Sequence, residues 1–382
     1  MKTLRIWMTR MRVMTSKELM QLLRDTVLII FTIYAFTFDI YWAGSGVSLS
    51  LNNAALMVFD GDSSYASREL TSRFREPYFQ NVGSLSHSRD TNDVLDEGEA
   101  MVTLDIPEGF EQSLLRGEQS TVQMQVDTTN TVLGLLASSY GQQIIGRYGL
   151  EVAMKQQGLS PDGGISGPIL DDRHRVWFNP NQEDSWFMSI AELLTIITVF
   201  SMMLPAAAMV REKERGTIEQ LLVSPLSAFQ VMFSKVLAMT LVIVLLSSIS
   251  LFLVIGGLFG VPFKGSPWLF LGLATLYVFT TSGLGLVIAT FSRNMAQAGM
   301  LIILLIAPMI FLSGAWTPPE AMPTVMRWLM MVSPLHYFID AGYGVLLKGA
   351  TLTTLAPQIL GMCVLGGLNF ALGLWRFRRQ FA

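Results

Sequence analysis

The sequence predicts an α-helical membrane protein with six transmembrane helices and an inserted extracytoplasmic α/β domain. Three observations support this fold class. Of the 382 residues, 51% are hydrophobic and only 14% are charged, whereas soluble domains carry about 25% charged residues. Six apolar stretches approach the length of about 20 residues that a bilayer span requires. A long acidic segment without any such stretch separates the first two of them.

The spans are expected at residues 27–43, 187–210, 236–259, 268–291, 298–316 and 355–375. Lys and Arg in the short flanks of spans gather on the cytoplasmic side of a membrane. With six spans, fourteen such residues share one side, and the short loops opposite hold only Lys264, Arg327 and Lys348. We therefore expect a multi-pass protein of the cytoplasmic (inner) membrane, with both termini and the tail 376–382 in the cytoplasm.

Residues 1–26 predict a basic amphipathic helix on the cytoplasmic membrane surface. Apolar side chains such as Leu4 and Trp7 recur at roughly helical spacing with Arg and Lys between them, and helices of this kind lie in the bilayer interface. The segment differs from a cleaved signal peptide, because the bulky Tyr41 and Trp42 stand where small residues would be needed. We expect an uncleaved signal anchor.

Residues 44–186 predict a soluble α/β domain outside the membrane. Twenty Asp and Glu stand against nine Lys and Arg there, a net charge of −11. The acidic surface is either a solvated face or a surface for a cationic partner. The patterning predicts strands at residues 54–59, 100–105 and 121–126, helices at 64–74, 91–99, 110–117 and 130–157, and a Gly- and Pro-rich loop at 160–168.

Residues 187–375 predict a five-helix transmembrane domain, whose cytoplasmic loop 211–235 carries the most informative pattern. Gly216 permits a sharp bend where the membrane helix ends. Thr217 and Gln220 have capping-box spacing, so a new helix should start there, and Pro225 should stop it. The apolar side chains of this short helix are Ile218, Leu221 and Leu222. Either a partner protein covers them or the helix lies on lipid, and the residues alone leave both readings open.

An outer hairpin is expected within residues 317–354. Residues 321–332 and 335–347 are apolar, but each segment is too short to span a bilayer, and Pro334 breaks between them. Broken helices at membrane depth need protein or a cavity to cover their backbone. The hairpin therefore either packs on the bundle and caps a translocation route, or forms two amphipathic helices in the outer interface.

Two carboxylates, Asp39 and Glu192, lie within apolar runs near their outer ends. Intramembrane acids of this kind are candidates for a transport pathway. The alternative is an interfacial position with access to water.

Other classes of function lack support in the sequence. A single cysteine, Cys363, excludes an internal disulfide framework, and the scattered His87, His174 and His336 give no metal-ligand spacing. We find no catalytic arrangement and no metal site. The near-neutral net charge of −3 gives no nucleic-acid footprint.

The cytoplasmic loop resembles that of the ABC type-2 exporter permeases. The matching residues are Glu212, Gly216, Thr217, Leu221, Leu222 and Pro225, followed ten positions later by Lys235. The resemblance implies that this segment is a coupling helix, which docks into a separate ATP-binding subunit.

Two further stretches support the same family. Gly314, Pro318, Pro323 and Pro334 resemble its outward re-entrant segment, which implies a role as an outer gate. In the acidic domain, residues 59–62 (Phe-Asp-Gly-Asp) and 106–110 (Ile-Pro-Glu-Gly-Phe) are similar to the YhhJ- and YbhS-like branch, whose layout has a large domain after the first span.

The resemblance implies an ATP-driven exporter that moves a hydrophobic or amphipathic substrate outward. ATP and Mg would bind the partner ATPase, because this chain has no phosphate-binding loop: residues 260–265 have the glycine spacing, but no Lys follows. The implied protein partners are the ATPase, a second permease copy or a paralogue, and a periplasmic adaptor protein. Membrane lipid is the remaining partner. The alternative is a membrane-anchored sensor or scaffold whose outer domain binds a ligand.

Overall fold

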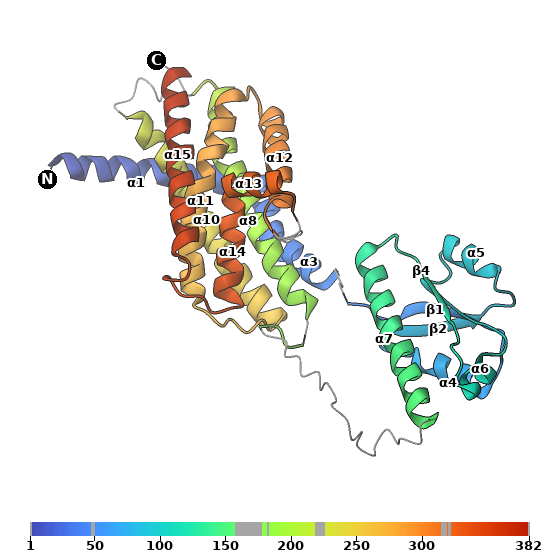
Figure 1. The fold of residues 1–382 in the computed structure, drawn as a ribbon. Helices are drawn as coiled ribbons and strands as arrows, with labels where there is room; N and C mark the ends of the chain where they lie inside the picture. Colours follow the sequence, from blue (N-terminus) through green and yellow to red (C-terminus); the bar gives the residue numbers. More distant parts are fainter. Residues whose placement is uncertain are drawn as a thin grey trace. The chain divides into compact units, whose positions relative to one another are not determined.

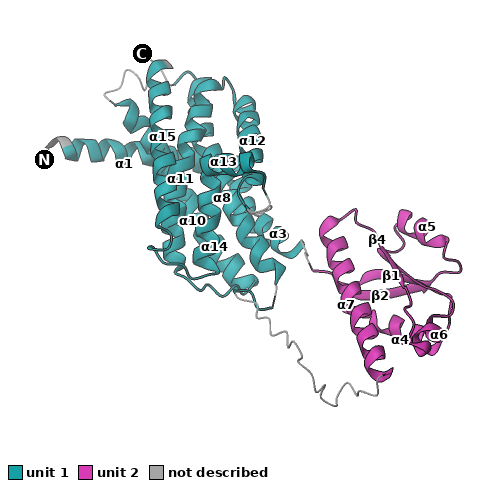
Figure 2. Ribbon diagram, in the orientation of Figure 1, with its two compact units in different colours: residues 1–47, 176–382 teal, residues 48–175 magenta. Residues whose placement is uncertain are grey.

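The computed structural model describes residues 2–46, 50–156, 178–181, 183–217, 226–314, 319 and 322–380. The chain divides into two compact units, which are described separately (Figure 2). The first, mainly helical unit comprises Met1–Val47 and Val176–Ala382. The second unit is Ser48–Arg175, an α/β fold inserted between the first and second long apolar helices.

Five helical stretches of the first unit are long and apolar enough to cross a bilayer. They are α2–η1–α3 (Thr26–Gly46), α8 (Asp184–Glu214), α10 with η2 (Ala228–Leu258), α11 (Pro267–Phe291) and α15 (Ala356–Gln380). These five confirm five of the expected spans as helices. The remaining one is α12 (Met295–Phe311), whose 17 residues extend about 26 Å, somewhat less than a bilayer core. A sixth span thus stays a prediction.

The helix α1 (Lys2–Leu23) lies across the long helices of this unit rather than along them (Figure 1). Only one edge of it is buried, where Met11, Met14, Glu18 and Leu22 face the bundle. Most of its other apolar side chains are exposed, as expected for an amphipathic surface helix.

The helix α10 begins at Ala228, eight residues before the span expected from hydropathy. Its start is fixed by a capping box: the Gln230 amide donates to the Ser227 hydroxyl at 3.3 Å, and the Ser227 amide donates to the Gln230 side chain at 3.0 Å. Lys235, which the sequence placed before the span, therefore lies inside the helix.

Hydroxyl groups join the buried faces of α8 and α11. Tyr277 and Thr198 are hydrogen-bonded at 2.9 Å, and Thr281 donates to the Ser201 hydroxyl at 2.6 Å. Each hydroxyl satisfies another, so that polar groups can be buried among apolar ones at little cost. Gly285 brings the two helices close, because a Cβ there would collide with the backbone of Met202.

The expected short outer helices are present as α13 (Thr324–Val332) and α14 (Pro334–Leu346). Pro334 is in the first turn of α14, where a missing amide hydrogen costs nothing. The helix α14 packs into the bundle, and its Phe338 ring stacks on Tyr277 at 4.0 Å between centroids. In α13 only Met330 is buried. The structure thus combines the two expectations: one helix packs on the bundle, and the other is an amphipathic helix on its surface.

The second unit contains a four-stranded sheet with the order β2-β1-β3-β4. Its strands are β1 (Ala54–Asp60), β2 (Phe79–Ser84), β3 (Val102–Ile106) and β4 (Gln123–Val126). β1 pairs in parallel with both β2 and β3, and β4 is antiparallel to β3. Its helices are α4 (Tyr65–Arg73), α5 (Asp90–Asp96), α6 (Phe110–Arg116) and α7 (Thr131–Gln156). Every expected strand and helix is confirmed, and β2 is an additional strand.

The two sequence motifs of this unit meet at one edge of the sheet, since parallel strands end on the same side. The Gly61 amide donates to the Ile106 carbonyl at 2.9 Å. The Asp62 carboxylate accepts from the amides of Gly109 and Glu111 at 2.8 and 2.9 Å, and so caps α6 from a distant loop. Hydrogen bonds from the Ser64 side chain and from the Glu111 amide hold the pKa of Asp62 below its ordinary value of 3.8.

We expect Asp62→Ala to lower the free energy of unfolding of this unit by about 1 kcal/mol, the usual cost of a lost helix cap. Because the pKa of Asp62 is depressed in the folded state, its contribution to the free energy of unfolding is complete at neutral pH. The contribution is lost as the pH falls through that pKa. Hydrogen exchange of the α6 amides in the full chain measures the effect. Asp96→Ala, at an exposed position, is the control, and equal exchange in both variants would contradict the assignment.

Candidate functional site

The end of α8 leads directly into the loop that carries the coupling pattern. Gly216 has a φ of +65°, which a residue with a side chain rarely adopts. The Gly216 amide donates to the Lys213 carbonyl at 3.1 Å, and the Thr217 amide donates to the Glu212 carbonyl at 3.0 Å. This pair of bonds is a Schellman motif, so the predicted bend at Gly216 is confirmed.

Glu212 belongs to a cluster of four charges at this end of the bundle. The Lys235 ammonium of α10 lies 2.7 Å from the Glu212 carboxylate and 2.8 Å from the Glu18 carboxylate of α1. Lys17, also on α1, lies 2.6 Å from the other oxygen of Glu212. The side chains of Lys235, Glu18 and Glu212 are 0, 1 and 4% exposed. We call Lys17, Glu18, Glu212 and Lys235 the buried charge cluster.

The cluster is electrically neutral, with two ammonium groups and two carboxylates. Each buried ion loses several kcal/mol of hydration, which only close opposite charges can offset. For Lys17, burial opposes the charged form, but the hydrogen bond to Glu212 and the charge of Glu18 outweigh it, so the pKa of Lys17 is raised. The cluster therefore holds α1, α8 and α10 in one arrangement in which every charge has a partner.

The residues beside Glu212 tie α8 to the other neighbouring helices. Arg211 pairs with Asp25, the N-cap of α2, at 3.0 Å. The Lys213 ammonium donates to the carbonyl of Ala289 at 2.7 Å, at the C-terminal end of α11. Glu214 accepts from the Met295 amide at 3.0 Å, at the start of α12. The Lys213 cation therefore lies at the C-terminal end of α11 and the Glu214 anion at the N-terminal end of α12, where the helix dipole favours each charge.

Residues 211–214 thus form one turn, which we call the charged turn, with a different attachment at each position. It is bonded to α1, α2, α10, α11 and α12. A displacement of this turn would act on all five of these helices at once. Chemically, the arrangement is a set of ion pairs and charge-assisted hydrogen bonds between helices.

The other predicted coupling residues are only partly covered by the structure. Glu212, Gly216 and Thr217 are described, and Glu212 faces the bundle rather than solvent. The remaining members, Ile218, Leu221, Leu222 and Pro225, lie outside the described residues. Their role stays a prediction.

The predicted outer-gate residues lie around α13 and α14. Gly314 follows α12 with a φ of +88°, and a Cβ there would lie 3.8 Å from the His336 ring. Pro323 is the N-cap of α13, and Pro334 begins α14. Pro318 lies outside the described residues. The three described residues all stand at helix ends, where a change in chain direction occurs.

The predicted pathway residues lie near each other on neighbouring helical segments. Asp39 ends the π-helical segment η1 (Ala35–Asp39), and Glu192 is on α8, close enough for the charge of Asp39 to act on it. Both side chains are partly exposed. Across the part of the chain that the structure describes, no group of three or more His, Cys, Asp or Glu residues could hold a metal ion.

Sequence reasoning missed most of the buried charge cluster. Lys235 was noted as a flanking charge and as part of the family pattern, and Lys17 and Glu18 as parts of the basic N-terminal helix, but none of the three was expected to join Glu212 in a cluster. One signal could have revealed them: Lys235 stands between Ser234 and Val236 in an otherwise apolar run, and a lone cation in such a run requires an acidic partner.

Comparison with known proteins establishes the family. The model of the ABC-2 family transporter proteins matches residues 21–375, nearly the whole chain. The chain belongs to the ABC-2 transporter family. The resemblance noted in the sequence is therefore confirmed.

Three curated relatives from Escherichia coli (strain K12) match over nearly their full length. The inner membrane transport permease YhhJ is 32% identical over 364 residues, which is 95% of each chain. The probable multidrug ABC transporter permease YbhR is 27% identical over 97% of this chain and 99% of the relative. The probable multidrug ABC transporter permease YbhS is 23% identical over 92% of each.

Membership in the ABC-2 family makes the chain a membrane transport permease subunit of an ABC transporter, and such subunits are transporters rather than enzymes. This disfavours the sensor or scaffold alternative. The charged turn then lies at the base of the loop in which the family resemblance places the coupling helix.

We expect Lys235→Met to lower the stability of the helical unit by about 3–5 kcal/mol, because two buried carboxylates lose their shared partner. Thermal unfolding of the detergent-solubilised chain measures the loss, and proteolysis of α1 reports its release.

The matched control is the triple variant with Lys235→Met, Glu18→Gln and Glu212→Gln, which removes the unpaired charges and should regain most of the stability. Lys17 is 36% exposed and can turn to water in this variant. If the single variant Lys235→Met were as stable as the parent protein, the buried charge cluster would not hold the helices together.

Proposed function

We propose that this permease couples a separate ATPase subunit to outward transport through the loop that follows α8. The observation that carries the proposal is the charged turn, in which four consecutive residues bind five different helices. A loop attached to such a turn can pass a push from outside the bundle to the helices that surround the pathway.

The Schellman motif at Gly216 supports the mechanical part of this proposal. It fixes the exit direction of the chain from α8, so that force on the loop reaches Glu212 and Lys213 through two backbone hydrogen bonds. The short apolar helix expected at residues 217–225 would present its Ile and Leu side chains to the ATPase. ATP and Mg belong to that partner in this proposal, and this chain contributes no cofactor.

The proposed topology has six spans, with α12 as the fifth, and both termini in the cytoplasm. The excess of Lys and Arg on one side supports this orientation. The α/β unit then lies outside the cytoplasmic membrane. The name of the relative YhhJ places that protein in the inner membrane, which supports a multi-pass protein of the same membrane. A second permease copy or a paralogue would complete the pathway. A periplasmic adaptor would bind the acidic α/β unit.

The proposed substrate is hydrophobic or amphipathic. The names of YbhR and YbhS describe them as probable multidrug transporters, which supports a substrate of this class. Asp39 and Glu192 would face the pathway, and the segment with Gly314, Pro318, Pro323 and Pro334 would form its outer gate. The stacking of Phe338 on Tyr277 supports a gate that is braced by the bundle.

We expect Leu221→Asp to reduce recovery of the co-expressed ATPase by at least about tenfold, because a charge would enter an apolar docking surface. Co-purification from membranes measures the recovery, and thermal unfolding checks that the bundle stays folded. Leu352→Asp is the matched control, since Leu352 is 59% exposed in the loop before α15. ATPase recovery at the parental level would refute docking through this loop.

We expect a reporter inserted at Gly158 to be active only outside the cytoplasm, because residues 44–186 follow one outward span. A reporter fused after Ala382 is the control and should be active only inside. Paired reporters whose activity depends on compartment measure both positions. Cytoplasmic activity at Gly158 would overturn the proposed orientation.

A further inference from the structure

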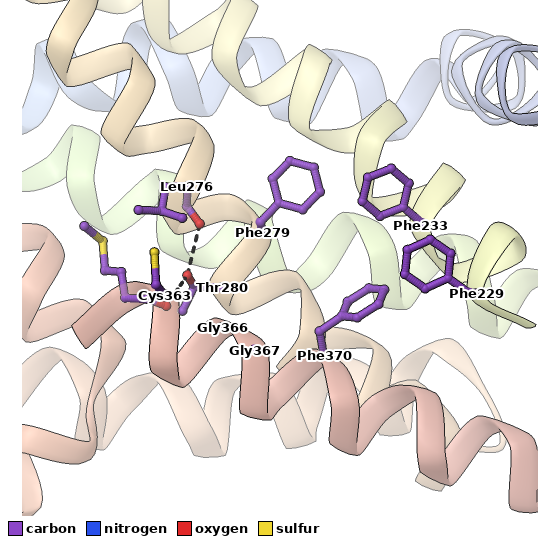
Figure 3. A pocket seen from close by; sticks show the side chains of 10 residues that line it. Phe229, Phe233, Leu276, Phe279, Thr280, Cys363, Gly366, Gly367 and Phe370 are labelled. Carbon is purple, nitrogen blue, oxygen red and sulfur yellow. Dashed lines mark hydrogen bonds between the residues drawn. The ribbon is translucent and has the colours of Figure 1, made fainter. Parts of the chain in front are cut away.

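A groove runs between α10, α11 and α15, with a cavity volume of about 290 Å³ (Figure 3). Four phenylalanine rings line one end of it: Phe229 and Phe233 from α10, Phe279 from α11 and Phe370 from α15. Neighbouring rings are in contact, with centroids 5.3 Å apart for Phe229 and Phe233 and 5.8 Å apart for Phe229 and Phe370. The groove is therefore a preformed apolar site.

Small residues explain why the groove is open. A Cβ at Gly283 of α11 or at Gly366 of α15 would collide with the opposite helix, so these two helices approach very closely. At Gly367, by contrast, a Cβ would meet no atom within 4 Å. One side of α15 is thus tightly packed on α11, while the next residue leaves space toward α10.

The groove lies on a face of the molecule that suits lipid. All three helices are candidate membrane spans, and α15 is the least covered of them, with 11% of its apolar window buried. On another face, α15 exposes a continuous apolar stripe of Leu360, Val364, Leu368 and Leu372. The long axis of the groove follows the helices, as an acyl chain in a bilayer does.

The end of α15 beyond Phe370 is strongly basic. Arg378 and Arg379 are exposed, and they follow Phe370 by about 12 Å along the helix. The segment 356–380 contains no Asp or Glu, so no carboxylate on this helix neutralises either guanidinium group. Arg379 stacks on the Trp375 ring at 5.1 Å, on a face of α15 away from the groove, which leaves Arg378 nearer to the groove. Basic side chains beside a groove between membrane helices favour anionic headgroups, and guanidinium groups match phosphate geometry.

We propose that this groove binds one anionic phospholipid, with an acyl chain along the phenylalanine rings and its phosphate at Arg378. The charge complementarity at one end and the apolar lining at the other select this occupant over a neutral lipid or a helix of a second copy. The site is distinct from the charged turn and does not depend on the transport proposal.

Native mass spectrometry of the full chain in nanodiscs tests the headgroup contact. The nanodiscs contain phosphatidylcholine doped with phosphatidylglycerol. We expect phosphatidylglycerol to be retained on the protein, and Arg378→Gln to reduce its retention by about fivefold. Arg293→Gln, an exposed arginine between α11 and α12, is the matched control. Equal retention of the two lipids, or equal loss in the control, overturns the proposal.

Gly367→Phe tests the groove itself, because Gly367 lines the groove and a Cβ there meets no atom within 4 Å. We expect it to abolish retention of phosphatidylglycerol with unchanged thermal stability. Gly299→Phe on α12 is the control, since a Cβ there also meets no atom within 4 Å. Unchanged retention in Gly367→Phe overturns the acyl-chain assignment.

Cys363, the single cysteine of the chain, lines the same groove and distinguishes lipid from a second copy. We expect a short bis-maleimide to give no cross-linked dimer in native membranes. A dimer cross-linked through Cys363 would identify this face as a permease–permease contact and overturn the lipid site.

Discussion

The helical unit depends on one buried ammonium group. Lys235 is fully buried in α10, where the carboxylates of Glu18 and Glu212 balance its charge. Apolar side chains tolerate small shifts of one helix along another, because each methyl group can find a similar contact nearby. A buried charge has no such freedom, since a shift that separates it from its partner costs several kcal/mol. The position of α1 and the end of α8 therefore follow from this contact.

The charged turn extends this constraint from one helix to the whole cytoplasmic end of the bundle. Arg211, Glu212, Lys213 and Glu214 point in successive directions around the helix, as a period of 3.6 residues requires. One turn therefore reaches neighbours on every side. The contacts are of different kinds: ion pairs in two cases, and charges at the ends of neighbouring helices in the other two. The same turn is continuous with Gly216, so the start of the loop and the attachments of the bundle form one rigid piece.

Much of the fold could be predicted, because hydrophobic runs and turn residues are local signals. The strand β1 alternates in burial and β3 is buried at four of its five residues. They end in Asp-Gly and Pro-Glu-Gly turns, and both were expected. The strand β2 was missed because Gln80, Asn81 and Ser84 give it no apolar alternation, and only its pairing with β1 makes it a strand. The candidate site was predicted less well. The pattern around Gly216 identified the bend, but the partners of Glu212 lie 195 and 23 residues away in sequence, and no local signal joins them.

The neutrality of the buried charge cluster has an electrical consequence. Moving a unit charge through the field of an energised membrane requires work, about 2.3 kcal/mol for a full crossing of 100 mV. Two positive and two negative groups that travel together carry no net charge, so the voltage performs no net work on their joint displacement. The resting potential of the cell therefore exerts no net force on the buried charge cluster as a unit.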